Sequence, residues 1–286
     1  MWIFLSVLCA WFLATADVFA KQELADGDTL VLSWARMVFA LPILAFLIPL
    51  GKPPSDPGTF LFWLAAALPL EILALLLYMA ALKRSPMSLT VPFLAFTPVF
   101  ILATGWMILG EKPGASGVTG VLLLAAGGYV ISIRAGSRGL AAPFRNFARE
   151  PGSVMMAGVT VIYSMTAVVG KKLILLSSPA FVALVYFACV AVILTAILAA
   201  RGGLGRVRPL FSRPGVWGMG ATQAGMIITH TLAVVLVPAA YMIAVKRTSL
   251  LFGVLYGLFL FGEADARYRL PGAALMMAGV FVLAFF

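Results

Sequence analysis

The chain consists of long apolar runs separated by short polar stretches. This pattern predicts ten membrane-crossing helices, over residues 2–20, 29–50, 60–82, 86–109, 116–133, 153–170, 179–200, 215–236, 238–261 and 270–286. The breaks have the composition of turns, as in GKPPSDPG and KRSP. Runs of this length favour helices over barrel strands, which need only about ten residues to cross. We therefore expect an all-α integral membrane protein.

The third to fifth predicted helices match the eighth to tenth at an offset of 152 residues. Pro86 coincides with Pro238, and Gly110-Glu111 with Gly262-Glu263, which chance agreement of apolar residues does not explain. A unit with an odd number of crossings inserts its tandem copy upside down, so the repeats are inverted about an axis in the membrane plane. The predicted division is residues 1–134 for the first five-helix repeat, 135–152 for a connecting loop and 153–286 for the second repeat.

Composition agrees with a membrane location and leaves few residues for a soluble domain. The chain is 63% hydrophobic and 10% charged, with a mean hydropathy of +1.09. Its formal net charge of +10 would suggest a nucleic-acid partner in a soluble protein. Here Lys and Arg gather in the odd-numbered loops, whereas the even-numbered loops hold only Lys52, Lys112, Lys171 and Lys172. The positive-inside rule then places both termini in the periplasm, and we expect no nucleic-acid partner.

Two segments of the repeat resemble a known family. The Gly-Glu helix ends in LGEKPGASGVTGVLLLAAGGYVI and FGEADARYRLPGAALMMAGVFVLAFF look like the signature of the drug/metabolite transporter superfamily. Within it, the chain is most similar to the ten-helix EamA-type members over essentially its whole length. The resemblance implies a basket of ten helices that moves small organic metabolites, often outward, by alternating access. It names no substrate, since members carry amino acids, nucleotide sugars, sugar phosphates and drugs.

Two adjacent cations, Lys246 and Arg247, lie inside the ninth predicted helix. As snorkelling residues at a helix end, they would leave only Thr248–Phe261 to cross, about 21 Å of helix. A helix that begins at Pro238 instead carries both cations about 12–13 Å inside it. A central Lys or Arg costs about 2.5–3.5 kcal/mol on insertion scales, so we expect the pair to face a wet cavity or an anion.

The chemistry of this pair favours an anionic or zwitterionic solute. Arg presents a planar fork that matches carboxylate or phosphate, and Lys adds a compact point charge. A Lys-Arg pair at this place also resembles the anion-binding arrangement in the sugar-phosphate branch of the superfamily. Because neighbouring helical residues point about 100° apart, one of Lys246 and Arg247 faces the cavity squarely. The other pairs with an acid or reaches a cytoplasmic vestibule.

Polar residues in the third and eighth helices coincide at the repeat offset. Glu71 falls on Gln223, and Tyr78 falls on His230. Glu71 could exchange a proton, bind a substrate ammonium or pair with Lys246 or Arg247. The alternative is an ion pair with a purely structural role. His230 is the only histidine of the sequence, and a hydrogen bond between helices is favoured for it over a proton relay.

Further candidates surround these residues. Four aromatic side chains are candidates for the cavity wall, with packing as the alternative for each. They are Trp11, Trp34, Tyr163 and Tyr186. We expect Arg36 to pair with Asp17 or to form a gate contact, rather than to bind the substrate. Glu111 and Glu263 end their helices and are expected to accept from backbone N–H groups of the following loop. Small residues that predict close helix packing are Gly117, Gly120, Gly127 and Gly128.

The sequence favours a secondary transporter over two other classes. We expect it to be a monomer or weak homodimer without cofactor or metal, exporting or exchanging a small solute across the bacterial inner membrane. Its site would lie between the third, eighth and ninth helices, with the first and sixth completing the wall. A membrane enzyme acting on lipid would need a nucleophile with a base, or a metal cluster, but the chain has one histidine and no H-E-x-x-H motif. A channel or scaffold subunit is the third alternative, and a channel would repeat a polar-lined helix in an oligomer.

Overall fold

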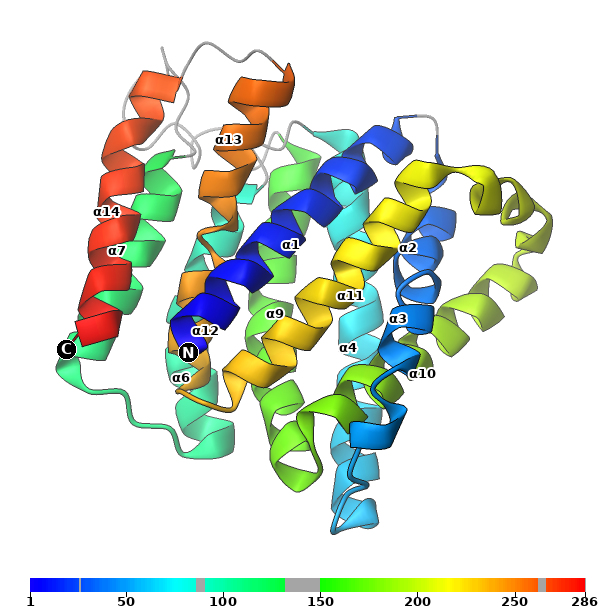
Figure 1. The fold of residues 1–286 in the computed structure, drawn as a ribbon, viewed down its shortest axis with the longest axis horizontal. Coiled ribbons are helices and arrows are strands. Elements are labelled where there is room, and N and C mark those ends of the chain that lie inside the picture. The colour runs from blue at the N-terminus through cyan, green and yellow to red at the C-terminus, as the bar shows by residue number, and fades with distance from the viewer. Residues whose placement is uncertain (26, 86–90, 132–149, 262–265, 286) are drawn as a thin grey trace.

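The computed structural model describes residues 1–25, 27–85, 91–131, 150–261 and 266–285, and over these ranges it contains helices and no strands (Figure 1). In the first half the elements are α1 (Trp2–Leu24), α2 (Thr29–Val38), α3 (Leu41–Ala45), η1 (Ile48–Leu50), α4 (Pro57–Arg84), η2 (Val91–Phe96), α6 (Thr97–Leu109) and α7 (Ala115–Ile131). In the second half they are α9 (Pro151–Leu176), α10 (Pro179–Ala200), η4 (Leu204–Arg206), η5 (Arg208–Ser212), α11 (Pro214–Val234), α12 (Ala239–Lys246), α13 (Ser249–Phe261) and α14 (Ala266–Phe285).

Several helices begin at the polar residues that interrupt the apolar runs. The Asp28 carboxylate accepts from the N–H groups of Leu30 and Val31, at 2.8 and 3.2 Å, and so caps α2. Asp56 caps α4 in the same way, and Ser178 caps α10. Proline occupies the first turn of α4, α9, α10 and α11. Proline lacks an N–H, which costs nothing there because N–H groups of the first turn have no acceptor within the helix.

The long helices have the length and hydropathy of membrane spans. Among the described residues, α1, α4, α9 and α10 are each long and apolar enough to cross a bilayer alone. Shorter apolar helical stretches cover Thr29–Ala45, Phe93–Leu109, Ala115–Ile131 and Leu270–Phe285. The expectation of an all-helical membrane protein is therefore confirmed.

Three of the predicted continuous helices are interrupted, so the prediction of one unbroken helix at each place is wrong. The run at 29–50 divides into α2, α3 and η1, and Pro42 lies in the first turn of α3. The run at 86–109 changes from η2 to α6 at Thr97, which Pro98 follows, and residues 86–90 lie outside the described ranges. The run at 238–261 divides at Arg247 and Thr248 into α12 and α13.

The break between α12 and α13 has no proline or glycine to explain it. Its backbone instead makes tight bonds of the 3₁₀ type, from Thr248 N to Val245 O at 2.9 Å and from Leu251 N to Thr248 O at 2.9 Å. Mid-helix stretches of this kind often mark functional sites. Lys246 is thus the last residue of α12, and Arg247 is its C-cap.

Helices from the two halves of the chain pack directly on one another. α1 packs on α11, α4 on α9, and α7 on α14 (Figure 1). The α7–α14 contact depends on glycine, because a Cβ at Gly127 would lie 2.7 Å from the carbonyl oxygen of Gly272. A Cβ at Gly120 would lie 3.2 Å from the carbonyl oxygen of Gly279. The predicted close packing through small residues is confirmed here.

Candidate functional site

A cavity of about 130 Å³ lies between the helices of the two halves. Its size resembles that of the ~150 Å³ cavities that admit benzene, so it has room for a small organic group. Eight of the predicted substrate-binding residues line it, namely Glu71, Tyr78, Tyr163, Tyr186, Gln223, His230, Lys246 and Arg247. Apolar side chains such as Leu75, Phe187 and Ile227 complete the wall. The cavity thus combines an apolar body with a few polar groups, as ligand sites usually do.

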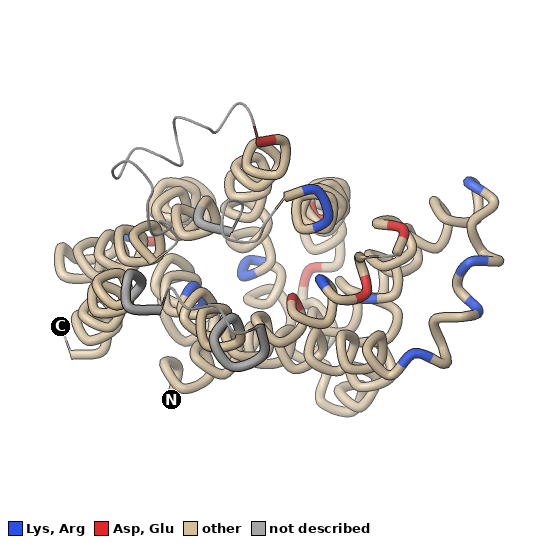
Figure 2. The backbone as a smooth tube through the Cα atoms, turned by 90° about the horizontal axis from the view of Figure 1, so that it is seen from above, with Lys and Arg blue, Asp and Glu red and all other residues tan. Residues whose placement is uncertain are grey.

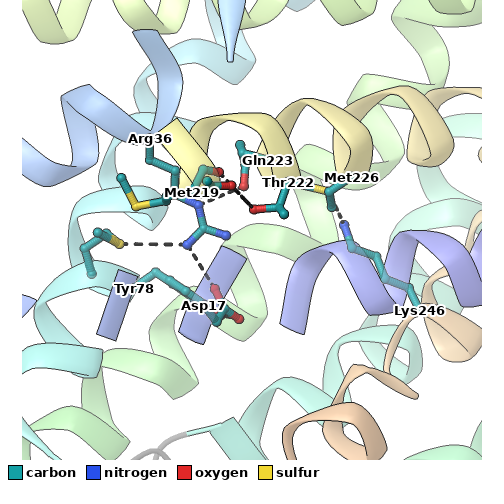
Figure 3. Close-up of polar contacts among 10 residues, drawn as sticks. Asp17, Arg36, Tyr78, Met219, Thr222, Gln223, Met226 and Lys246 are labelled. Atoms are coloured by element: carbon teal, nitrogen blue, oxygen red, sulfur yellow. Dashed lines mark hydrogen bonds and ion pairs between the residues drawn. The ribbon is translucent and has the colours of Figure 1, made fainter. Parts of the chain in front are cut away.

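The two cations reach the cavity from the break between α12 and α13. Arg247 is buried, at 5% exposure, and its Nη2 donates to Oγ1 of Thr97 at 2.8 Å. Lys246 Nζ lies 3.3 Å from Sδ of Met226 and 3.5 Å from Nδ1 of His230, and Figure 3 shows it directed towards Met226. Among the described residues, neither cation has a carboxylate partner, so the expected pairing of one of them with an acid is not found there.

Two buried polar atoms at the break have no hydrogen-bond partner among the residues that the structure describes. They are Nε of Arg247 and Oγ1 of Thr248. A buried donor left unsatisfied costs about 1–3 kcal/mol, and more when it is charged. The arrangement can therefore accept an anionic group from a solute.

A second polar cluster lies beside the cavity and centres on Arg36 of α2. Its Nη1 forms an ion pair with Oδ1 of Asp17 at 2.9 Å, and its Nε donates to Oε1 of Gln223 at 2.8 Å (Figure 3). Tyr78 donates to the other carboxylate oxygen of Asp17 at 2.5 Å. The ion pair of Arg36 with Asp17, which the sequence suggested, is thus present. Together with Tyr78 and Gln223, it connects α1, α2, α4 and α11.

Glu71 is separate from this cluster. Its Oε2 accepts from the Tyr186 hydroxyl at 3.3 Å, and both residues line the cavity. Gln223, which matches Glu71 in the repeat, is instead bound to Arg36. The two positions matched in the sequence therefore have different partners, and Glu71 provides the only carboxylate among the described residues that line the cavity.

Two of the aromatic candidates, Trp11 and Trp34, are not among the described residues that line the cavity, which agrees with the alternative that they pack. Trp11 is 40% exposed, and its ring lies 5.0 Å from that of Phe12. Trp34 is buried, but its indole N–H donates to Oγ1 of Thr195 at 2.8 Å and so fastens α2 to α10. The rotation of a helix about its own axis decides such cases, and neighbouring helices set that rotation.

A third polar cluster lies where α9, α11 and α12 meet the loop after α6. Lys171 Nζ contacts Oε1 of Glu111 and the carbonyl oxygen of Val237, both at 2.6 Å. The other carboxylate oxygen of Glu111 accepts from Ala239 N at 2.9 Å, the first N–H of α12. The expectation that Glu111 binds its own following loop is therefore wrong, and Glu263 lies outside the described residues.

This cluster also corrects the assignment of two lysines to a loop. α9 extends to Leu176, so Lys171 and Lys172 lie within it, and Lys171 is 7% exposed. The sequence analysis also missed Thr97, which binds Arg247. One signal for it was available, because Thr97 lies at the repeat offset from Ser249, where the second broken helix resumes.

Comparison with known proteins agrees with this description. Residues 1–133 match the EamA-like transporter family, which confirms the resemblance found in the sequence. A protein of Sinorhizobium sp., named an uncharacterized transporter in the cobO 3' region, is 28% identical over 136 residues, which are 46% of this chain and 96% of that protein. A crystal structure with 16% identity shares the fold over 98% of this chain and 94% of its own, with a TM-score of 0.68. The family match and the apolar helices together identify a multi-pass membrane protein.

Proposed function

We propose that the protein is a secondary transporter that moves a small anionic or zwitterionic metabolite by alternating access. The observation that carries this proposal is the cation pair Lys246 and Arg247 on the wall of a cavity between the two halves, where no described carboxylate forms an ion pair with either of them. A buried charge without a counter-charge is costly, so a solute anion that enters the cavity is stabilised there. The match to the EamA-like transporter family and the transporter name of the Sinorhizobium relative agree with this class.

The proposed architecture is ten spans in two inverted five-helix repeats, residues 1–134 and 153–286, joined by 135–152. In this scheme α2, α3 and η1 together form the second span, η2 and α6 the fourth, and α12 and α13 the ninth. Both broken helices resume at equivalent positions, Thr97 and Ser249, which supports the repeat. The packing of α1 on α11 and of α4 on α9 supports it too, since these pairs exchange under the repeat.

Glycines at the α7–α14 contact give further support. In the repeat Gly120 corresponds to Gly272, and Gly127 to Gly279. A Cβ at Gly120 would meet Gly279, and one at Gly127 would meet Gly272. In a two-fold contact residue i of one copy meets residue j of the other, and j meets i. The reciprocal pattern is what a two-fold axis between α7 and α14 would produce.

Within this scheme the polar residues have distinct roles. Lys246 and Arg247 attract the anionic group of the solute, while Glu71 with Tyr186 receives an ammonium, a hydroxyl or a coupling proton. Arg36 and Asp17 act as a gate contact beside the cavity. Export or exchange across the bacterial inner membrane completes the proposal and follows from the resemblance to the family. The orientation, with both termini in the periplasm, rests on the Lys and Arg distribution.

Transport by reconstituted protein tests the assignment. We expect Lys246→Ala, Arg247→Ala and Glu71→Gln each to lower uptake of a solute identified by metabolite-resolved efflux from a deletion strain. Lys52→Ala provides the matched control, because it removes an exposed cation that is not among the residues lining the cavity. Rates at the level of the parent protein in all three cavity variants would refute the assigned site.

A further inference from the structure

The connector between α10 and α11 concentrates positive charge at the edge of the helix bundle. It carries Arg201, Arg206, Arg208 and Arg213 and no acidic residue within residues 201–213. All four arginines are exposed. Figure 2 shows these basic positions along a segment that lies outside the main group of helices.

The connector is an ordered piece of structure. Gly202 ends α10 with a φ of +63°, a left-handed conformation that favours glycine. The short helices η4 and η5 follow, and Leu210 is buried at 5% exposure, which anchors the segment. The ring of Phe211 lies 5.0 Å from that of Phe39 at the end of α2. The charged side chains are therefore presented by a fixed backbone.

Large apolar side chains are exposed on the same segment. Leu204 is 48% exposed, Phe211 54%, and Trp217, at the start of α11, 45%. α10 is one of the helices long and apolar enough to span a bilayer, and the connector begins where α10 ends. A segment at that level lies at the boundary between headgroups and acyl chains, where exposed aromatic and apolar residues are stabilised.

Only part of the charge is neutralised within the protein. Arg206 forms an ion pair with Asp28 at 3.2 Å, and Arg213 with Glu23 at 3.1 Å. Arg201 and Arg208 have no carboxylate partner among the described residues. Two exposed guanidinium groups thus remain available, and guanidinium matches phosphate oxygens with paired hydrogen bonds.

We propose that residues 201–213 bind the headgroups of anionic phospholipids in the adjacent leaflet. Arg201 and Arg208 hold the lipid phosphate, and Leu204 and Phe211 contact the upper acyl chains. Control of topology during insertion explains basic residues in a loop, but it needs no ordered backbone with exposed apolar side chains beside them. The proposal is independent of the transported solute.

Lipid binding by the purified chain in neutral detergent tests this interaction. Native mass spectrometry would follow titration with short-chain phosphatidylglycerol and, in parallel, with phosphatidylcholine of the same chain length. We expect tighter binding of phosphatidylglycerol, and about thirtyfold weaker binding in Arg201→Gln/Arg208→Gln, since each surface arginine contributes roughly a fivefold factor. Arg201→Lys/Arg208→Lys should lose less affinity than the Gln variant, because it keeps the charge but not the paired hydrogen bonds of guanidinium.

The control removes the same number of exposed cations from other loops. Lys52→Gln/Lys112→Gln should bind phosphatidylglycerol within about twofold of the parent protein. Leu204→Ser should weaken both lipids alike, because it removes apolar contact and no charge. The proposal is overturned if the arginine double variant binds phosphatidylglycerol as the parent does, or if the lysine control loses as much. Complete competition by an equal concentration of inorganic phosphate, or binding of a soluble protein in place of lipid, would overturn it as well.

Discussion

Replacing Asp17 with Asn leaves the Arg36 guanidinium without its counter-charge inside the helix bundle. The two side chains are 8% and 4% exposed, and Arg36 Nη1 lies 2.9 Å from Asp17 Oδ1. Removing one partner of a buried pair costs about 3–5 kcal/mol, because the other charge stays buried without compensation. Asn keeps the shape and one acceptor oxygen, so we expect a loss at the lower end, about 3 kcal/mol in the free energy of unfolding.

Unfolding in mixed micelles of mild detergent and SDS, followed by tryptophan fluorescence, measures this loss. A double-mutant cycle with Arg36→Met isolates the pair, and the double variant should be more stable than the sum of the single losses predicts. Asp28→Asn is the matched control, since it makes the same chemical change in an ion pair with Arg206 whose side chains are 46% and 62% exposed. Asn also caps helices as well as Asp does, so this control should cost less than about 1 kcal/mol.

The comparison between the two Asp→Asn variants decides the outcome. Equal losses for Asp17→Asn and Asp28→Asn would refute the reasoning, because only the first of the two ion pairs is buried. An additive cycle for Asp17 and Arg36 would refute it too, since it would mean that the two side chains do not stabilise one another.

Three further predictions use the same unfolding assay. Glu111→Gln should cost about 2–3 kcal/mol, because Lys171 stays buried without its carboxylate, and an unchanged protein would contradict the role of this pair. Gly202→Ala should cost about 1 kcal/mol, since the backbone φ of +63° strains other residues, and added stability would exclude the left-handed turn. Gly127→Ala should cost about 1–3 kcal/mol by forcing α7 from α14, and a neutral effect would mean that the two backbones are further apart than described.

Helix ends marked by local chemistry were predictable from the sequence. The prediction of a helix over 179–200 agrees with α10, because Ser178 caps the helix and Pro179 fits its first turn. Positions that need small side chains for close helix packing, such as Gly120 and Gly127, were predictable as well. The break between α12 and α13 was not predictable from the sequence. It consists of 3₁₀ hydrogen bonds at Val245 and Thr248, and no proline or glycine marks it.

Candidate site residues divide in the same way. Intramembrane charge marked Lys246, Arg247 and Arg36 as residues in need of a polar environment, because hydrocarbon cannot solvate them. Their partners depended on packing: Thr97 binds Arg247 across 150 positions of the chain, and Gln223 binds Arg36 rather than facing Glu71. A local sequence pattern cannot reveal contacts between residues so far apart in the chain.

The sequence by itself determined the helical membrane class, the likeness to EamA-type transporters and the positions that need small side chains. These properties follow from hydropathy and residue chemistry, which are local. Tertiary structure alone decided which helix faces turn inward, as for Trp11 and Trp34, and which charges meet, as for Lys171 and Glu111. The physical reason is that the rotation and tilt of each helix are set by packing against all of its neighbours at once. The sequence of a single helix therefore does not determine them.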